Sequence, residues 1–191
     1  LNIRPYSHRP WLLAYINTNC VRHREQAFDD LSQLARDRGL EAPHALGKCH
    51  GSSNDNFWNY TRNGGNRLHS VVEQLQNYRF ALTMENSETP GYITEKIANA
   101  FIAGTIPVYF GTREIFEIFN ERAFVFYDVH DPHSALDRIA RLATNESEYR
   151  KVLSEPVLAR GEETLREYFS LTDDVGTGSL KSRIQRFIGV Y

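Results

Sequence analysis

Short apolar runs alternate with longer amphipathic segments along most of the chain. The short runs are bounded by polar or turn-forming residues, which is typical of buried strands. The longer segments carry apolar residues at the three- and four-residue spacing of a helix. The predicted strands are 11–17, 44–47, 80–84, 105–110 and 123–129, and the predicted helices between or after them are 21–40, 67–78, 93–104, 112–120 and a last one at 179–191.

This alternation predicts a parallel sheet with helices on both faces, because parallel strands need a crossover connection. We expect a doubly wound, Rossmann-like α/β fold forming a single domain over 1–191. Pro107 conflicts with the pattern, since a proline normally confines a strand to a sheet edge. Residues 48–66 are rich in Asn, Gly and Ser and are expected to form a long loop, in which the aromatic residues of 57–60 could stack on a base or a sugar or anchor the loop.

Composition narrows the classes of function. The chain has 191 residues, 41% of them hydrophobic, with a net charge of -2, which fits a globular domain and gives no sign of a nucleic-acid partner. No apolar run reaches the length of about 18 residues that a membrane-spanning helix needs. The chain begins without Met, as expected of a domain from a longer protein.

Cys20 and Cys49 are the two cysteines of the chain. No CxxC pair is present, so the sequence predicts no zinc site. Such a low count favours two free thiols over a disulfide.

Polar side chains gather in the stretch 84–97 (MENSETPGYITEKI), between a predicted strand and the start of a predicted helix. Ligands of doubly wound folds bind at this edge of the sheet, where helix N-termini attract phosphate. Lys96 opposes the helix dipole unless it faces an anion, and Glu95 could accept hydrogen bonds from a ribose. Asn86 offers a donor and an acceptor, and Tyr92 a flat face with a hydroxyl.

A second strand-to-helix turn, at 17–25, carries Arg22 and Arg24 and should reach the same edge of the sheet. Two cations beside a helix N-terminus suit a diphosphate. The chain has no GxGxxG and no GxxxxGK[ST], which argues against a dinucleotide oxidoreductase and a P-loop enzyme. It also has no acidic pair suited to a metal–diphosphate, so we expect the diphosphate charge to be met without a metal. Taken singly, each of these polar residues would be typical of an exposed turn or helix start.

The run 79–111 resembles the donor-binding motif of the α1,3/α1,4-fucosyltransferases, glycosyltransferase family 10. Arg24 fits best the arginine that the family carries upstream, with Arg22 second, and the likeness extends over about residues 11–150. Met84 departs from the usual Phe. The matching positions within the run are Glu85, Asn86, Ser87, Tyr92, Thr94, Glu95, Lys96 and Pro107.

The resemblance implies one Rossmann-like half of a GT-B glycosyltransferase that binds GDP-fucose and needs no cofactor. Arg24 and Lys96 would neutralise the diphosphate, Glu95 would hold the ribose, and Asn86 and Tyr92 would lie against the phosphates and the sugar. Fucose would pass with inversion, and without a metal, to a hydroxyl of a glycan acceptor. The resemblance also implies that the proline at position 107 is a feature of the family, which resolves its conflict with the strand pattern.

The same family has a separate acceptor domain that supplies the general base, and 191 residues leave room for the donor half only. We therefore expect the base to come from outside the chain, from a partner acceptor domain or a homo-oligomer. The acidic and histidine residues expected near the cleft, for which structural or solvated roles are favoured, are Glu85, Glu88, His50 and Asp55.

Two alternatives stay open: a transferase for another GDP-sugar, and a non-catalytic nucleotide-sugar-binding or interaction module. The family implies the Golgi lumen for a eukaryotic protein and the cytoplasm for a bacterial or viral one, and the sequence does not choose between them.

Overall fold

The computed structural model describes residues 8–51 and 67–169. The expectations for Asp55, for the aromatic residues of 57–60 and for the helix at 179–191 lie outside the described residues. Within them, no helix is both long and apolar enough to cross a membrane.

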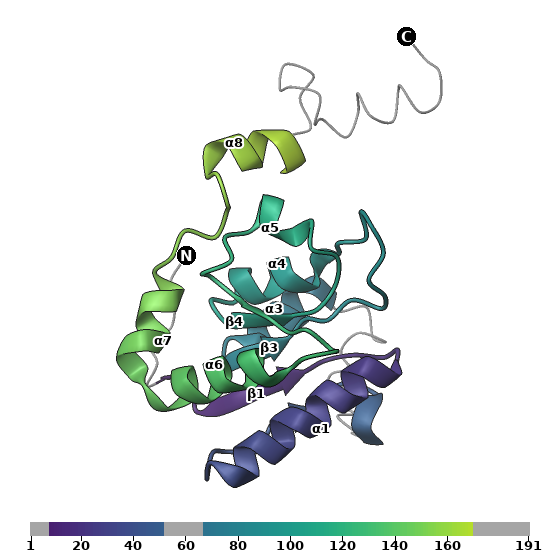
Figure 1. Ribbon diagram of the computed structural model, residues 1–191, viewed down its shortest axis with the longest axis vertical. Coiled ribbons are helices and arrows are strands. Elements are labelled where there is room, and N and C mark those ends of the chain that lie inside the picture. The colour runs from purple at the N-terminus through teal and green to yellow at the C-terminus, as the bar shows by residue number, and fades with distance from the viewer. Residues whose placement is uncertain (1–7, 52–66, 170–191) are drawn as a thin grey trace.

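The centre of the fold is a parallel five-stranded sheet with the strand order β2-β1-β3-β4-β5 (Figure 1). The chain builds β1 and β2 outward in one direction, and then returns past β1 to build β3, β4 and β5. The topological switch point therefore lies between β1 and β3, where doubly wound proteins bind their ligands. The strands are β1 (Trp11–Tyr15), β2 (His44–Ala45), β3 (Tyr78–Leu82), β4 (Ile106–Tyr109) and β5 (Val125–Phe126).

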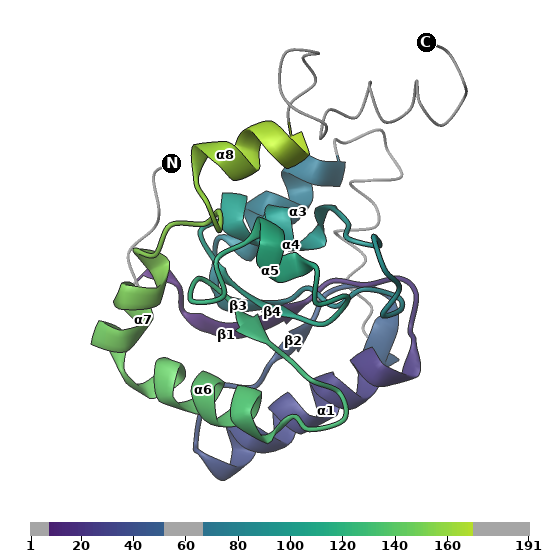
Figure 2. The same ribbon diagram turned by 45° about the horizontal axis from the view of Figure 1, so that its top comes forward.

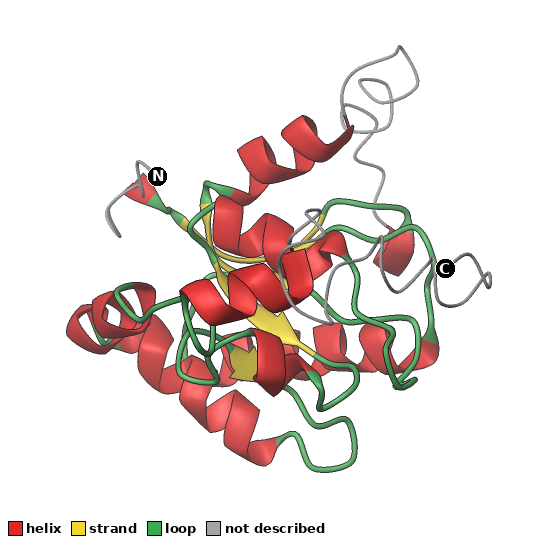
Figure 3. Cartoon of the chain, turned by 90° about the horizontal axis from the view of Figure 1, so that it is seen from above, coloured by secondary structure: helices red, strands yellow, loops and turns green. Residues whose placement is uncertain are grey.

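Helices cover both faces of the sheet, as the alternation of segments predicts (Figures 2 and 3). On one face, α1 (Arg22–Asp37) and α6 (His133–Thr144) bury an apolar stripe that includes Leu31 and Ile139. On the other face, α3 (Arg67–Leu75) and α4 (Glu95–Ile102) pack against the opposite side of the same strands. The doubly wound, Rossmann-like α/β fold is thereby confirmed.

The remaining elements lie around this three-layer core. A third apolar cluster joins α4 and β4 to the short helix α5 (Ile115–Ile118). The chain then continues from α6 into α7 (Glu146–Leu153). The last described elements are α8 (Glu162–Thr164) and the π-helical turn η3 (Leu165–Phe169), and a 3₁₀ turn, η2 (Cys49–Gly51), follows β2.

Several elements are shorter than the sequence pattern predicts. The run 123–129 forms a strand only at Val125–Phe126, and the helix expected over 112–120 is limited to Ile115–Ile118. Pro107 lies in an internal strand, since β4 is flanked by β3 and β5. The general expectation that a proline confines its strand to a sheet edge is therefore wrong here. Pairing with β5 starts only at Val108, opposite Val125, so the missing N–H of Pro107 falls outside the paired segment on that side.

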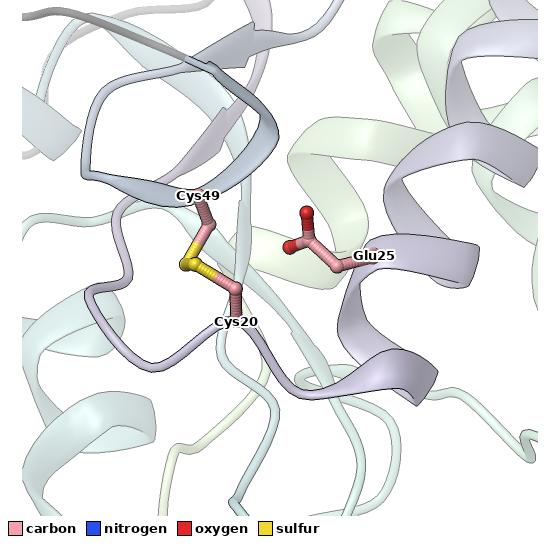
Figure 4. A group of neighbouring side chains, drawn as sticks. All are labelled: Cys20, Glu25 and Cys49. Atoms are coloured by element: carbon pink, nitrogen blue, oxygen red, sulfur yellow. A yellow bond between two sulfur atoms is a disulfide. The ribbon is translucent and has the colours of Figure 1, made fainter.

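Cys20 and Cys49 form a disulfide, so the expectation of two free thiols is wrong (Figure 4). Cys20 follows β1 and Cys49 follows β2, and the parallel pairing of these strands brings both turns to one edge of the sheet. Their Cα atoms are 5.2 Å apart, within the range that a disulfide spans. A low cysteine count could not reveal this proximity, because it depends on the order of the strands.

Glu25 lies beside the disulfide, as Figure 4 shows. Its carboxylate accepts hydrogen bonds from the Tyr15 hydroxyl at 2.5 Å and from the backbone N–H of His50 at 3.1 Å. Both sulfur atoms are bonded to each other and cannot act as thiolate ligands. The three side chains therefore fasten the turns after β1 and β2 to α1.

Candidate functional site

A cleft of about 450 Å³ lies at the carboxyl ends of β1 and β3, at the topological switch point. This is the position and the size range of small-molecule sites in doubly wound folds. Its walls come from the turn after β1, the end of β3, α3 and the first two turns of α4. The lining residues are Ala14, Ile16, Asn17, Thr18, Asn19, Arg24, Val71, Leu75, Ala81, Leu82, Thr83, Asn86, Glu95, Lys96 and Asn99.

Arg24 is almost completely buried in the first turn of α1, with 1% of its surface exposed. Its guanidinium donates to the carbonyl oxygens of Met84 at 3.0 Å and Asn19 at 2.9 Å, and to Oδ1 of Asn86 at 2.7 Å. Burial lowers the pKa of Arg24 below its ordinary value, and Tyr15 and Glu85 counter the shift. Arginine nevertheless stays charged in proteins. Arg24 thus joins both predicted turns and brings a positive charge to the cleft.

Asn86 connects Arg24 to the aromatic residue of the motif. Its Oδ1 accepts from Arg24 and, at 3.3 Å, from Nδ2 of Asn19, while its Nδ2 donates to the Tyr92 hydroxyl at 3.0 Å. The amide of Asn86 is therefore oriented by three neighbours. Tyr92 does not itself line the cleft and is placed next to it through Asn86.

Glu85 is fully buried and acts as an anchor for the start of α4. Its carboxylate accepts the backbone N–H of Thr94 at 2.7 Å, lies 2.8 Å from the Thr94 hydroxyl, and pairs with Nζ of Lys96 at 3.0 Å. A buried carboxylate needs such partners, because desolvation without them is costly. The side chain of Lys96 keeps 23% of its surface exposed and lines the cleft. Glu85 thereby fixes a cation at the mouth of the cleft.

The neighbourhood of Glu85 leaves no room for a side chain at residue 111. A Cβ atom on Gly111 would collide with the hydroxyl group of Tyr109 and lie 3.0 Å from Cγ of Glu85. The Tyr109 hydroxyl is buried without a hydrogen-bond partner in the described part of the chain, and burial together with Glu85 raises its pKa. The glycine that ends the β4 segment therefore protects the packing around the buried carboxylate.

The structure brings together only part of the predicted site. Arg24, Asn86, Glu95 and Lys96 line one cleft, with Glu95 exposed at its rim, whereas Thr94 is engaged by Glu85. Ser87 is exposed and pairs with Thr89, and Arg22 is exposed as well; neither lines the cleft.

The residues named as acids or bases near the cleft do not line it. Glu85 is enclosed by its partners, and Glu88 is exposed outside the cleft. His50 follows the disulfide-bonded Cys49 and pairs with Asp29 at 3.0 Å. Among the described residues, the acid that lines the cleft is Glu95, and none of the nominated bases within this part of the chain faces the cleft.

The motif did not reveal the part of the lining that comes from α3 and the second turn of α4. Val71 and Leu75 of α3 and Asn99 of α4 line the cleft together with Ala81 and Thr83. Helical spacing contained a signal for Asn99, since it follows Glu95 by four residues and Lys96 by three and therefore shares their face.

The fold and the cleft define a doubly wound α/β protein in which two cations, Arg24 and Lys96, line a cleft at the switch point. The family model described as glycosyltransferase family 10 (fucosyltransferase) C-term matches residues 7–154. The chain belongs to this family of fucosyltransferases, which confirms the resemblance.

Curated relatives match in part of their length. An α-(1,3)-fucosyltransferase of Helicobacter pylori is 38% identical over 92 residues, which cover 48% of this chain and 19% of the relative. Human α-(1,3)-fucosyltransferase 7 is 43% identical over 84 residues, covering 42% of this chain and 24% of the relative. The matched segment is therefore less than a third of either relative.

Solved structures share the fold. A crystal structure of an α1,3-fucosyltransferase with GDP-fucose superposes with a TM-score of 0.64 at 24% identity, covering 95% of this chain and 47% of that one. A Staphylococcus aureus TarM structure in complex with UDP gives a TM-score of 0.55 at 14% identity, covering 100% and 38%. The chain thus corresponds in fold to about half of the fucosyltransferase, as expected for one half of a GT-B enzyme.

Proposed function

We propose that this chain binds GDP-fucose in the switch-point cleft and serves as the donor-binding part of an inverting fucosyltransferase. Membership of the family supports the proposal, and so does the shared fold of an α1,3-fucosyltransferase crystallised with GDP-fucose. The observation that carries it is the meeting of Arg24 and Lys96, from two strand-to-helix turns, at a single cleft. A diphosphate is the ligand group whose charge such a pair of cations matches.

The two cations would stabilise the leaving group without a metal. Arg24 is preorganised by its backbone partners, and Lys96 is held by Glu85 beside the N-terminus of α4. Fixed positive charge of this kind lowers the energy of a transition state in which negative charge develops on a phosphate. Lys96 can share its three N–H donors between Glu85 and a phosphate oxygen, so donor binding does not require the buried pair to break.

Other residues of the motif take the remaining parts of the donor. Glu95, exposed at the rim, would accept hydrogen bonds from the ribose hydroxyls. Asn86 and Tyr92 would lie against the phosphates and the sugar. Thr94 and Glu85 would act through Lys96 and the start of α4, since both are engaged with one another. Ser87 and Arg22 do not line the cleft, and the proposal assigns them no contact with the donor.

In the reaction, an oxygen of an acceptor glycan would form a bond to the anomeric carbon of fucose while the bond from that carbon to the GDP oxygen breaks. Attack from the opposite face inverts the configuration, and the proton of the acceptor hydroxyl passes to a general base. We expect that base to come from an acceptor domain or a second chain. The domain alone would then bind the donor but transfer fucose poorly.

Calorimetric titration with GDP, GDP-fucose, GDP-mannose and UDP-glucose tests the proposal. We expect the GDP compounds to bind more tightly than UDP-glucose, and Lys96→Ala to weaken their binding at least tenfold, because it removes one cation and leaves Glu85 without its counter-ion. Lys151→Ala, an exposed lysine of α7, is the matched control and should bind as the parent does. Equal binding by Lys96→Ala and the parent would contradict the proposal.

The competing GDP-sugars address the main alternative. Contacts to the diphosphate and the ribose do not distinguish one sugar from another. A transferase for another GDP-sugar could therefore use the same two cations. A clear preference for GDP-fucose over GDP-mannose would support the fucosyl donor, and the reverse preference would favour the alternative.

A further inference from the structure

Asn99 is a buried polar residue of the cleft whose side chain has no hydrogen-bond partner in the described part of the chain. It lies in the middle of α4, with 7% of its surface exposed, and it lines the cleft. Across residues 8–51 and 67–169, its amide makes no hydrogen bond. The amide atoms themselves are not fully enclosed, so the amide opens to the cleft and can hydrogen-bond to a ligand there.

Asn99 lies beyond Lys96 along α4. Along α4 it follows Lys96 by almost one turn, on the same face and about 5 Å further along the helix axis. Apolar residues of α3 and β3, among them Val71, Leu75 and Ala81, line the same cleft. The cleft therefore combines a cationic mouth, as we call the part next to Arg24 and Lys96, with apolar side chains and the amide of Asn99.

These two kinds of lining, cationic and apolar, match the two ends of a nucleoside diphosphate. Apolar walls suit the faces of a flat heteroaromatic base, and an amide has a donor and an acceptor side by side for the edge of the base. Guanine offers the complementary pair, with the O6 acceptor next to the N1–H donor. We propose that Asn99 binds the guanine base of the donor nucleotide, donating from Nδ2 to O6 and accepting N1–H at Oδ1.

The inference rests on the proposed function, because it takes the diphosphate to lie at the cationic mouth. It adds a residue that determines which nucleotide the cleft accepts. Glu95, one turn before Asn99 on the same face, would then meet the ribose between base and phosphates.

Titration of the parent and of Asn99→Leu with GDP, IDP and inorganic pyrophosphate tests the proposal. Leucine has the size of asparagine but cannot hydrogen-bond, so Asn99→Leu should bind GDP about tenfold or more weakly. Its affinity for pyrophosphate should stay that of the parent, since pyrophosphate occupies only the cationic mouth. IDP keeps O6 and N1–H and lacks the 2-amino group, so the parent should bind it nearly as well as GDP.

Lys96→Ala gives the opposite pattern and separates the two proposals. It should weaken GDP and pyrophosphate alike, whereas Asn99→Leu should weaken GDP alone. Thermal unfolding of each variant shows that it is folded. An Asn99→Leu variant that binds GDP as the parent does, or that loses pyrophosphate in equal measure, overturns the role of Asn99 and leaves the proposed function standing. A parent that binds neither ligand overturns the proposed function, and this inference with it.

Discussion

Reduction of the disulfide should cost this domain a large part of its stability. Cys20 and Cys49 are 29 positions apart, and the cross-link removes the entropy of that loop from the unfolded chain. The loop-entropy relation gives a loss of about 3.5 kcal/mol for a loop of this length. For a chain of this size, that loss corresponds to a fall in melting temperature of roughly 7–14 °C.

The assay is thermal unfolding followed by circular dichroism, with and without a thiol reductant, with a thiol titration to show that both sulfurs are reduced. Cys20→Ser combined with Cys49→Ser should match the reduced parent. Donor binding should weaken too, because the disulfide fastens the turn whose Asn19 carbonyl accepts from Arg24. A fully reduced domain that melts at the same temperature as the oxidised one would refute the reasoning.

Two further predictions concern the buried groups around Glu85 and the sheet. Gly111→Ala should destabilise the domain by about 1–3 kcal/mol, because the added Cβ collides with the Tyr109 hydroxyl. The loss should be smaller in a Tyr109→Phe background, which lacks that hydroxyl. Chemical denaturation measures both losses, and an equal loss in the two backgrounds would contradict the packing argument. Stability should also fall as the pH rises from about 10 towards 12. Burial raises the pKa of Tyr78 to about 12, so over this window the unfolded chain loses the phenol proton while the folded one keeps it. Denaturant midpoints across this range check the sign, and a flat profile would contradict it.

The pattern of the sequence was sufficient for the architecture of the fold. Short apolar runs and helical spacing located the strands and helices, and their alternation predicted a parallel sheet covered on both faces. The strand order did not follow, because several orders satisfy the same alternation. Short elements were the least predictable, since tertiary contacts rather than local pattern decide whether Val125–Phe126 extends further.

The sequence predicted only part of the candidate site. Arg24 and Lys96 could be placed at one edge of the sheet from their position after strands, because parallel strands end together. The motif could not show that Glu85 points inward to hold Lys96, nor that Ser87 points away from the cleft. Sequence spacing placed Asn99 on the face of Lys96, but only the packing of α3 against α4 makes it part of the wall.

The central claim is that the diphosphate of GDP-fucose lies between Arg24 and Lys96. A crystal structure of the chain soaked with GDP-fucose tests it most directly. We expect phosphate oxygens within about 3 Å of both the Arg24 guanidinium and the Lys96 ammonium, the distance of charge-assisted hydrogen bonds. A nucleotide bound elsewhere on the chain, or one whose phosphates contact neither cation, would contradict the account.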